Sequence, residues 1–531
     1  RCRAHGRQGA GPAAKVRRRC AGVAAPAGAA PGEPAGDARR RPRAAAARAL
    51  LGLLLILAYV GFAFWLAALR PERALLGMVF LIPWGALYTD FGLSVSACQI
   101  MVLALLLCTL ARSLQPGWTG VPMAAGRLLA LLLLWALLTS LLQVARVPDV
   151  ALKTAGLRGP TTRAIIQMAM YTFSMSPMLL VLLWVRSTDA IAAMARTYVL
   201  SALLLAVIGW LQLVVWVGTG TNPMPIGFFN DWAGGTVKLS EGVVQFGKIN
   251  VFRMNSFAGE PRTLGGALVY AMLIIQAVGA ISTAVPRRKL VALWLFLAVS
   301  TIATLSTSAV LIWSIGSIVQ FPLARLFGVR LRVSGPRIAL MLGAVMLPFG
   351  LAAAAIEASG FPIFDLLAQR TIERIDASGA VEDFDLAIIS YFQAHPLDSI
   401  AGVGLGNAHL YAQRYIDPEF QWYALGGVFT AKTQYLRLIS EIGFIGLGLF
   451  LLWYLVLLID AAVAVRRLPV LAPILSMAAG TIVIFFASGQ FIAEFYHVAG
   501  ALGALCAVAN RQRSGAPPPQ FAPPQLTGAA A

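Results

Sequence analysis

Residues 434–459 read QYLRLISEIGFIGLGLFLLWYLVLLI, and this stretch decides the fold class. A helix needs about 20 predominantly apolar residues to cross the roughly 30 Å hydrocarbon core of a bilayer. Its polar side chains, Gln434, Arg437 and Glu441, fall at one end, three and four residues apart, so they share one helix face. We therefore expect a membrane-spanning helix whose polar stripe lines a water-filled cavity or a ligand path.

Similar apolar runs recur along most of the chain. The 531 residues are 59% hydrophobic and only 12% charged, with a mean hydropathy of +0.77. These values exclude an ordinary soluble domain. The long apolar runs also exclude a transmembrane β-barrel, whose strands alternate at period two over about 10 residues. The sequence predicts an all-α polytopic membrane protein.

The membrane spans can be located from the length of the apolar runs. The segments 74–91 and 93–111 are the weakest candidates, because they are short, barely separated and interrupted by Pro83 and Asp90. We therefore predict about 12 membrane helices, with both termini on the cytoplasmic side. The candidate spans are 48–69, 74–91, 93–111, 123–145, 164–185, 190–217, 262–284, 290–306, 309–327, 338–356, 434–459, 470–488 and 490–509.

The hydrophilic segments set the domain organisation. Residues 1–46, rich in Ala, Pro and Arg, and residues 511–531 are predicted to be disordered tails on a membrane domain at 47–510. Basic clusters such as 287–289 should be cytoplasmic. Alternation from these clusters places the longest hydrophilic loop, 357–433, outside the cytoplasm and before the last three helices.

Neither the excess of basic residues nor the cysteines indicate a nucleic-acid, disulfide or metal site. The chain carries 42 Lys and Arg against 22 Asp and Glu, a net charge of +20. In a soluble protein this would indicate a nucleic-acid partner, but here the excess lies in the N-terminal tail and at helix ends, so none is expected. The five cysteines show no disulfide framework or zinc spacing. We predict no metal and no cofactor.

Three charged residues, Arg253, Glu260 and Arg262, stand next to the start of a predicted membrane helix. One interpretation is an Arg–Glu pair that anchors the helix end at the membrane interface. The other is an anion site, because the planar fork of arginine suits phosphate oxygens.

The long outer loop contains a second candidate site. After an apolar-periodic stretch at 384–392, predicted to be a helix along the membrane, residues 395–407 read HPLDSIAGVGLGN. Three alternating glycines precede Asn407, and His409 and Arg414 follow. Such a run forms either a tight turn between loop helices or part of a binding loop.

Three local matches together resemble the superfamily of O-antigen ligases and O-antigen polymerases. The passage at 396–407 is similar to the family pattern PLxGxGxGN, with two extra residues before the glycines. YLRLISEIGFIG at 435–446 is close to YLxxLxExGxxG, and Arg253 with Glu260-Pro261 resembles the Arg and Glu-Pro pattern before a family membrane helix. Two positions depart: Lys432 stands where the family has histidine, and residues 306–308 lack the arginine of a Ser-Arg turn.

The resemblance implies a multi-pass protein of the bacterial inner membrane. It implies inverting transfer of an oligosaccharide from an undecaprenyl pyrophosphate carrier to a growing polysaccharide or a lipid or other acceptor. Neither a nucleotide sugar nor a metal takes part in that scheme. Membrane lipids and other polysaccharide export proteins are the further expected partners.

The candidate site residues follow from the charges and the matched motifs. We expect Arg253, Arg262 and Lys432 to hold the pyrophosphate, and Glu260 or His409 to move or orient a proton. The remaining substrate-binding candidates are Arg414, Asn407, Arg437 and Glu441.

Two other functions stay open. One is a polysaccharide flippase or other transporter, whose intramembrane charged residues line a substrate path. The other is an inactive relative that serves as an assembly scaffold, a reading supported by the missing family histidine. Accumulation of lipid-linked single repeat units after loss of the gene is expected for a polymerase and for neither alternative.

Overall fold

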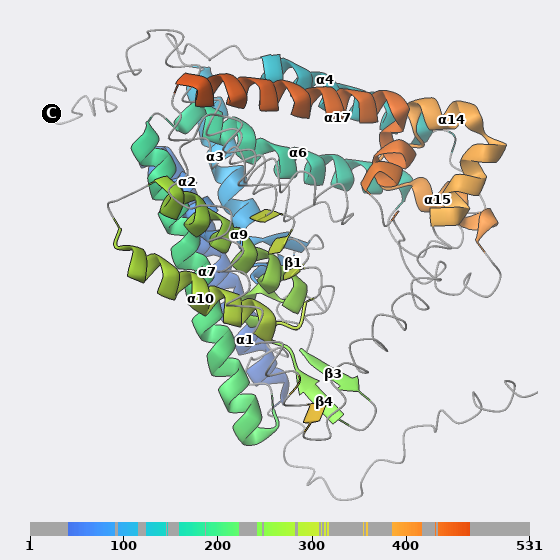
Figure 1. The fold of residues 1–531 in the computed structure, drawn as a ribbon. Coiled ribbons are helices and arrows are strands. Elements are labelled where there is room, and N and C mark those ends of the chain that lie inside the picture. Colours follow the sequence, from blue (N-terminus) through green and yellow to red (C-terminus); the bar gives the residue numbers. More distant parts are fainter. Residues whose placement is uncertain are drawn as a thin grey trace, which may run out of the picture. The chain divides into compact units, whose positions relative to one another are not determined.

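The computed structural model describes residues 41–90, 94–114, 124–144, 146, 159–185, 187–221, 242–246, 249–281, 285–306, 309–310, 313–314, 316–317, 354, 357–358, 385–416, 431 and 434–467 (Figure 1). Helices account for 85% of them. The predicted spans 470–488 and 490–509, the tail 511–531 and most of 309–327 and 338–356 lie outside the described residues. The predicted loop 357–433 is described at 357–358, 385–416 and 431.

The described elements are helices and two pairs of antiparallel strands. Strand β1 (Tyr88–Asp90) pairs antiparallel with β2 (Ser94–Ser96), and β3 (Val243–Phe246) pairs in the same way with β4 (Ile249–Phe252). The all-α prediction is therefore right for the bulk of the described chain but missed both hairpins. Residues 385–394 are helical. The labelled helices of the described chain are α1 (Arg41–Leu69), α2 (Pro71–Leu81), α3 (Ala97–Ser113), α4 (Ala124–Val144), α6 (Pro160–Trp184), α7 (Thr188–Thr219), η1 (Ser256–Ala258), α9 (Pro261–Ile281), α10 (Arg287–Ala303), α14 (Pro396–Ala401), α15 (Ala408–Ala412), η2 (Gln413–Tyr415) and α17 (Gln434–Arg467).

The chain divides into two compact units, Arg1–Leu55 and Ile56–Ala531. The boundary between them falls within α1. In the first unit, the described residues 41–55 form the beginning of α1. This helix starts at Arg41, before the boundary predicted at 47. Pro42 is tolerated in a first turn, and the alanines that follow it are the best helix formers.

Within the described residues, five helices are long and apolar enough to cross a membrane. They correspond to predicted spans at 48–69, 123–145, 164–185, 190–217 and 434–459, and they identify a membrane protein. The count of about 12 spans stays a prediction. The five stretches are Gly52–Leu69, Gly126–Val144, Pro160–Trp184, Asp189–Thr219 and Tyr435–Val463.

The predicted span 74–91 is wrong as a continuous helix. Helix α2 ends at Leu81, and β1 occupies the end of the predicted span. Pro83 lacks the N–H that a helical ladder needs. Beyond it, the backbone turns toward η1, where Ala86 N donates to Phe257 O at 2.8 Å.

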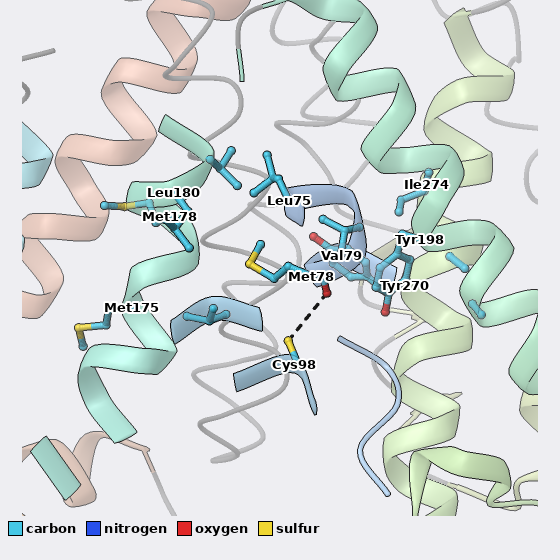
Figure 2. Packing of buried hydrophobic residues seen from close by; sticks show 14 of the residues in the cluster. Leu75, Met78, Val79, Cys98, Met175, Met178, Leu180, Tyr198, Tyr270 and Ile274 are labelled. Atoms are coloured by element: carbon cyan, nitrogen blue, oxygen red, sulfur yellow. Dashed lines mark hydrogen bonds between the residues drawn. The ribbon is translucent and has the colours of Figure 1, made fainter. Parts of the chain in front are cut away.

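Buried apolar side chains of α2, α6, α7 and α9 form part of the core (Figure 2). The α2 side chains lie between those of α6 on one side and those of α7 and α9 on the other. The thiol of Cys98, at the start of α3, donates to Met78 O at 3.8 Å. The labelled side chains are Leu75, Met78, Val79, Cys98, Met175, Met178, Leu180, Tyr198, Tyr270 and Ile274.

Polar bonds between helices supplement this packing. Trp84 Nε1 donates to Ser201 Oγ at 2.8 Å, and Trp184 Nε1 donates to Thr109 Oγ1 at 3.0 Å. A polar group in hydrocarbon finds no water, so indole N–H groups need partners within the protein. These bonds connect α7 to the turn after α2, and α6 to α3.

Candidate functional site

Helix α17 is interrupted inside its membrane-spanning stretch. Gly443 has φ 72° and ψ −179°, which is not helical. A break of this kind deprives the preceding carbonyl groups of their helical partners. In a membrane these groups need replacement donors, because water is absent.

Donors from two other segments satisfy the carbonyl groups before the break. Two belong to the backbone of the glycine loop, defined as Gly402–Asn407, and one is an indole N–H on α4. Figure 1 shows α4 running beside α17, with α14 at one end of α17. The bonds run from Val403 N to Ser440 O at 2.8 Å, from Gly404 N to Glu441 O at 3.0 Å and from Trp135 Nε1 to Ile442 O at 2.8 Å.

The glycines of the loop are required by backbone conformation and by close approach. Gly402, Gly404 and Gly406 have φ of 82°, 84° and 72°, a region that favours glycine. A Cβ on Gly406 would lie 2.6 Å from Gln167 Cγ. The loop is thus a turn between α14 and α15, as one interpretation held, and it also packs against membrane helices.

The glycine loop is fastened to the end of α4 as well. Leu405 N donates to Ser140 Oγ at 3.0 Å. The hydroxyl of Tyr411, on α15, donates to Gln143 O at 2.9 Å. The loop and α15 therefore join α4 and α17 into one unit.

Glu441 lies at the centre of a buried polar cluster next to the break. Its side chain is 2% exposed, and Oε1 lies 3.5 Å from Arg437 Nε. The hydroxyl of Tyr171, on α6, donates to Glu441 Oε2. The predicted stripe on α17 thus does present Arg437 and Glu441 together, and sequence reasoning missed Tyr171, which is distant in the chain.

His409 is buried, with 5% of its surface exposed, and contacts Arg163 on α6. Arginine can only donate, so Nε2 of the imidazole accepts from the guanidinium. Burial, and then the charge of Arg163, lower the pKa of His409 to about 3, against a hydrogen bond with the Gly406 backbone that raises it. The imidazole is therefore neutral at physiological pH, with its proton on Nδ1.

Asn407 and Arg414 occupy different environments. The side chain of Asn407 is fully buried, and its Nδ2 donates to Pro160 O, at the start of α6, at 3.4 Å. Arg414 is exposed in η2. Asn407, His409, Arg437 and Glu441 therefore belong to one region around the glycine loop, and Arg414 lies on the surface of the same loop segment.

Arg253 belongs to a different part of the chain from the glycine loop and directly follows β4. Its Nε donates to Thr304 O at 3.2 Å, and its own backbone N donates to Gly242 O at 2.7 Å. Thr304 follows α10 and precedes residues 306–308, where the family resemblance expects a Ser-Arg turn. The structure thus places Arg253 against the residue that ends α10.

Glu260 and Arg262 flank Pro261 at the start of α9. Glu260 is exposed, and its carbonyl accepts from Leu264 N at 3.0 Å. A carboxylate at a helix N-terminus is stabilised by the helix dipole. Arg262 is half-buried in the first turn.

Two strained residues adjoin the Arg253 contact. Among the described non-glycine residues, positive φ occurs at Ser256 and Leu305, each at 48°. Such conformations are unfavourable for residues with a Cβ, and they cluster at functional sites. The strain lies on both segments that Arg253 joins, β4–α9 and the turn after α10.

Lys432 lies outside the described residues, as does the side chain of Gln434. The described candidates thus fall into the region around the glycine loop and the segment around Arg253. No family model matches the chain, and no curated protein matches it.

Proposed function

We propose that the chain is an inverting membrane glycosyltransferase that moves an oligosaccharide from an undecaprenyl pyrophosphate carrier to a growing polysaccharide or another acceptor. The supporting observation is that two motifs distant in sequence, the glycine loop and residues 435–446, meet through backbone hydrogen bonds at the break in α17. Both motifs carry the resemblance to O-antigen ligases and polymerases. Their contact supports the proposal that the two motifs belong to one site.

The transfer requires an acceptor hydroxyl held in line with the anomeric carbon, and charge stabilisation of the departing pyrophosphate. Arg253, Arg262 and Lys432 bind the pyrophosphate. The hydroxyl oxygen forms the new bond to the anomeric carbon as the bond to the phosphate oxygen breaks. The electron pair of that bond leaves with the pyrophosphate.

Glu260 accepts the proton of the acceptor hydroxyl in this scheme. The alternative, His409, has its Nε2 lone pair engaged by Arg163. Glu260 is exposed and carries no such constraint from burial. His409 is therefore assigned a positioning role, and Asn407, Arg414, Arg437 and Glu441 contribute to saccharide binding.

The proposal places the chain in the bacterial inner membrane, with residues 357–433 on its outer face. An undecaprenyl carrier presents its saccharide at that face, where membrane lipids surround it and other polysaccharide export proteins act. The outward placement rests on the alternation of basic clusters along the chain.

The test is polymer formation in cells that carry Arg253→Ala or Lys432→Ala. Both variants should lose polymer, and Arg127→Ala, which removes an exposed arginine from α4, should not. Unchanged polymer with both site variants would refute the assignment. Loss of the gene should cause accumulation of lipid-linked single repeat units if the chain is a polymerase.

A second candidate, a polysaccharide transporter, is favoured by one observation. Substrate sites of secondary transporters often lie at interrupted membrane helices, and α17 is interrupted at Gly443. A transporter would leave its lipid-linked substrate on the cytoplasmic face when the gene is lost. In inverted vesicles the cytoplasmic face is outermost. A glycosidase added outside should therefore digest the accumulated substrate if the chain is a transporter, and leave it protected if the chain is the glycosyltransferase.

A further inference from the structure

Arg163 is a buried cation at the positive end of a helix. Helix α6 begins at Pro160, so Arg163 lies in its first turn, with 8% of its surface exposed. Gly159, the N-cap, provides no side-chain cap. The first-turn amides and the helix dipole both favour an anion at this end and disfavour a cation.

Within the described part of the chain, no acidic side chain balances Arg163. The one side chain bonded to its guanidinium is the neutral imidazole of His409. Neighbouring arginines do have acidic partners: Arg437 lies 3.5 Å from Glu441, and Arg146 lies 4.0 Å from Asp398. A buried charge is unfavourable until it is paired, so this position is suited to an anion from outside the chain.

An acceptor atom beside the same turn also lacks a partner. Asn407 Nδ2 donates to Pro160 O, but Oδ1 has no hydrogen-bond donor among the described residues, and the side chain is fully buried. Buried polar atoms are nearly always bonded, so this oxygen is suited to a hydroxyl donor. Thr161 and Thr162 are exposed and offer a side from which a ligand can approach the turn.

We propose that the first turn of α6 binds a phosphate-bearing saccharide. Its phosphate oxygens contact Arg163 and the amides of Thr161 and Thr162, and a sugar hydroxyl donates to Asn407 Oδ1. The anion site rests on the described geometry alone. Its identification with a lipid-linked diphosphate rests on the proposed glycosyltransferase function, to which it adds a phosphate-binding group.

The matched variants His409→Glu and His409→Gln test the anion site, because they differ in charge while keeping the same length. Glutamate would supply Arg163 with an internal carboxylate, and glutamine would not. The full chain is purified in lipid nanodiscs, and binding of inorganic diphosphate and of a polyprenyl diphosphate is measured. We expect the Glu variant to bind both probes at least about tenfold more weakly than the Gln variant, the loss expected for a charge-assisted contact. Equal affinities would overturn the proposal.

The saccharide part of the proposal has its own variant. Asn407→Leu should weaken binding of a saccharide-linked polyprenyl diphosphate more than it weakens binding of inorganic diphosphate, because it removes the proposed hydroxyl contact as well as the bond to Pro160 O. If Asn407→Leu and the wild type bind the saccharide-linked probe with equal affinity, the proposed contact between a sugar hydroxyl and Asn407 Oδ1 is ruled out. Comparison of the inorganic and polyprenyl probes distinguishes a free phosphate ligand from a lipid head group. Arg127→Ala lowers the net charge by one unit, as His409→Glu does, at an exposed position on α4, so it controls for a general effect of net charge.

A readout on the wild-type protein covers variants that fail to fold. Inorganic diphosphate should slow amide hydrogen exchange at Thr161, Thr162 and the glycine loop, and unchanged exchange would contradict the site. The anion site and the proposed enzymatic function can fail independently, because one concerns binding and the other concerns transfer. If the chain binds diphosphate through Arg163 but forms no polymer, the anion site stands and the proposed function is refuted.

Discussion

Gly402 and Gly443 face each other backbone to backbone, one in the long loop and the other at the break in a membrane helix. A Cβ on Gly402 would lie 2.5 Å from Gly443 N, and a Cβ on Gly443 would lie 2.1 Å from Ile400 O. Both glycines also have positive φ, 82° and 72°. The close approach allows the loop amides to reach the carbonyl groups that the break leaves without helical partners.

Alanine at either glycine should destabilise the protein. Positive φ alone costs about 1–2 kcal/mol for a residue with a Cβ, and the overlap with backbone atoms adds to this cost. Thermal unfolding of Gly402→Ala and Gly443→Ala in detergent should show lower midpoints than wild type.

Gly448→Ala is the matched control on the same helix. Its Cβ would meet no atom within 4 Å. Because alanine is the better helix former by up to about 1 kcal/mol, the control should be neutral or stabilising. Equal destabilisation of all three variants would contradict the close contact between loop and helix.

The fold could be predicted from the sequence where a single segment determines its own structure. The apolar runs at 123–145 and 434–459 exceed the length of a bilayer core, and both form helices of that kind. The prediction of one helix at 74–91 failed because apolar composition does not report where a helix ends. The end of α2 and the path of the backbone after it depend on Pro83 and on a hydrogen bond from Ala86 N to the carbonyl of Phe257, a residue far along the chain.

The candidate site was predictable to a similar extent. Helical spacing correctly placed Arg437 and Glu441 on one face. Their partner Tyr171, and the Arg163 that contacts His409, come from α6, more than two hundred residues earlier in the chain. Neither has a local sequence signal that points to a partner on α15 or α17, so no spacing rule could identify them.

The Tyr171–Glu441 bond should show coupling in a double-mutant cycle. Tyr171→Phe leaves a buried carboxylate with one donor fewer, a loss of about 1–3 kcal/mol. Glu441→Gln removes the charge that pairs with Arg437. Because the two residues share one network, the free energy of unfolding of the double variant should differ from the sum of the single effects by about 0.5–3 kcal/mol.

Chemical unfolding of the four proteins in detergent measures this coupling. Tyr415→Phe, at a residue 38% exposed in η2, serves as the control for loss of a tyrosine hydroxyl. Additive effects of Tyr171→Phe and Glu441→Gln would contradict a direct bond.

The glycine-loop region should lose stability in acid because of His409. Its pKa falls from 6.5 to about 3 in the folded protein through burial and then the charge of Arg163. Below pH 6.5 the unfolded chain binds the proton and the folded chain does not. Stability is therefore complete above pH 6.5 and declines as the pH falls toward 3, by at most several kcal/mol at about 1.4 kcal/mol per pKa unit.

Amide exchange of residues 402–416 between pH 7 and pH 4, corrected for the intrinsic exchange rate, follows this decline. His409→Gln removes the titrating group and keeps an acceptor for Arg163, so it should flatten the pH dependence. The same slope in the variant and the wild type would assign the effect to other groups.

Replacing Ser256 should separate stability from function at the Arg253 segment. Ser256 has φ 48° and is fully buried, and its hydroxyl has no hydrogen-bond partner among the described residues. Ser256→Gly should relieve the strain and raise stability by about 1 kcal/mol, while the bond from the residue 256 amide to Gln212 Oε1, 2.8 Å, is retained. Ser256→Ala removes the same hydroxyl and keeps the strain, so its thermal midpoint should lie below that of Ser256→Gly.

If the strain positions Arg253 for pyrophosphate, Ser256→Gly should form less polymer than Ser256→Ala despite its higher midpoint. A glycine variant that is less stable than the alanine variant would show that the conformation is not strained.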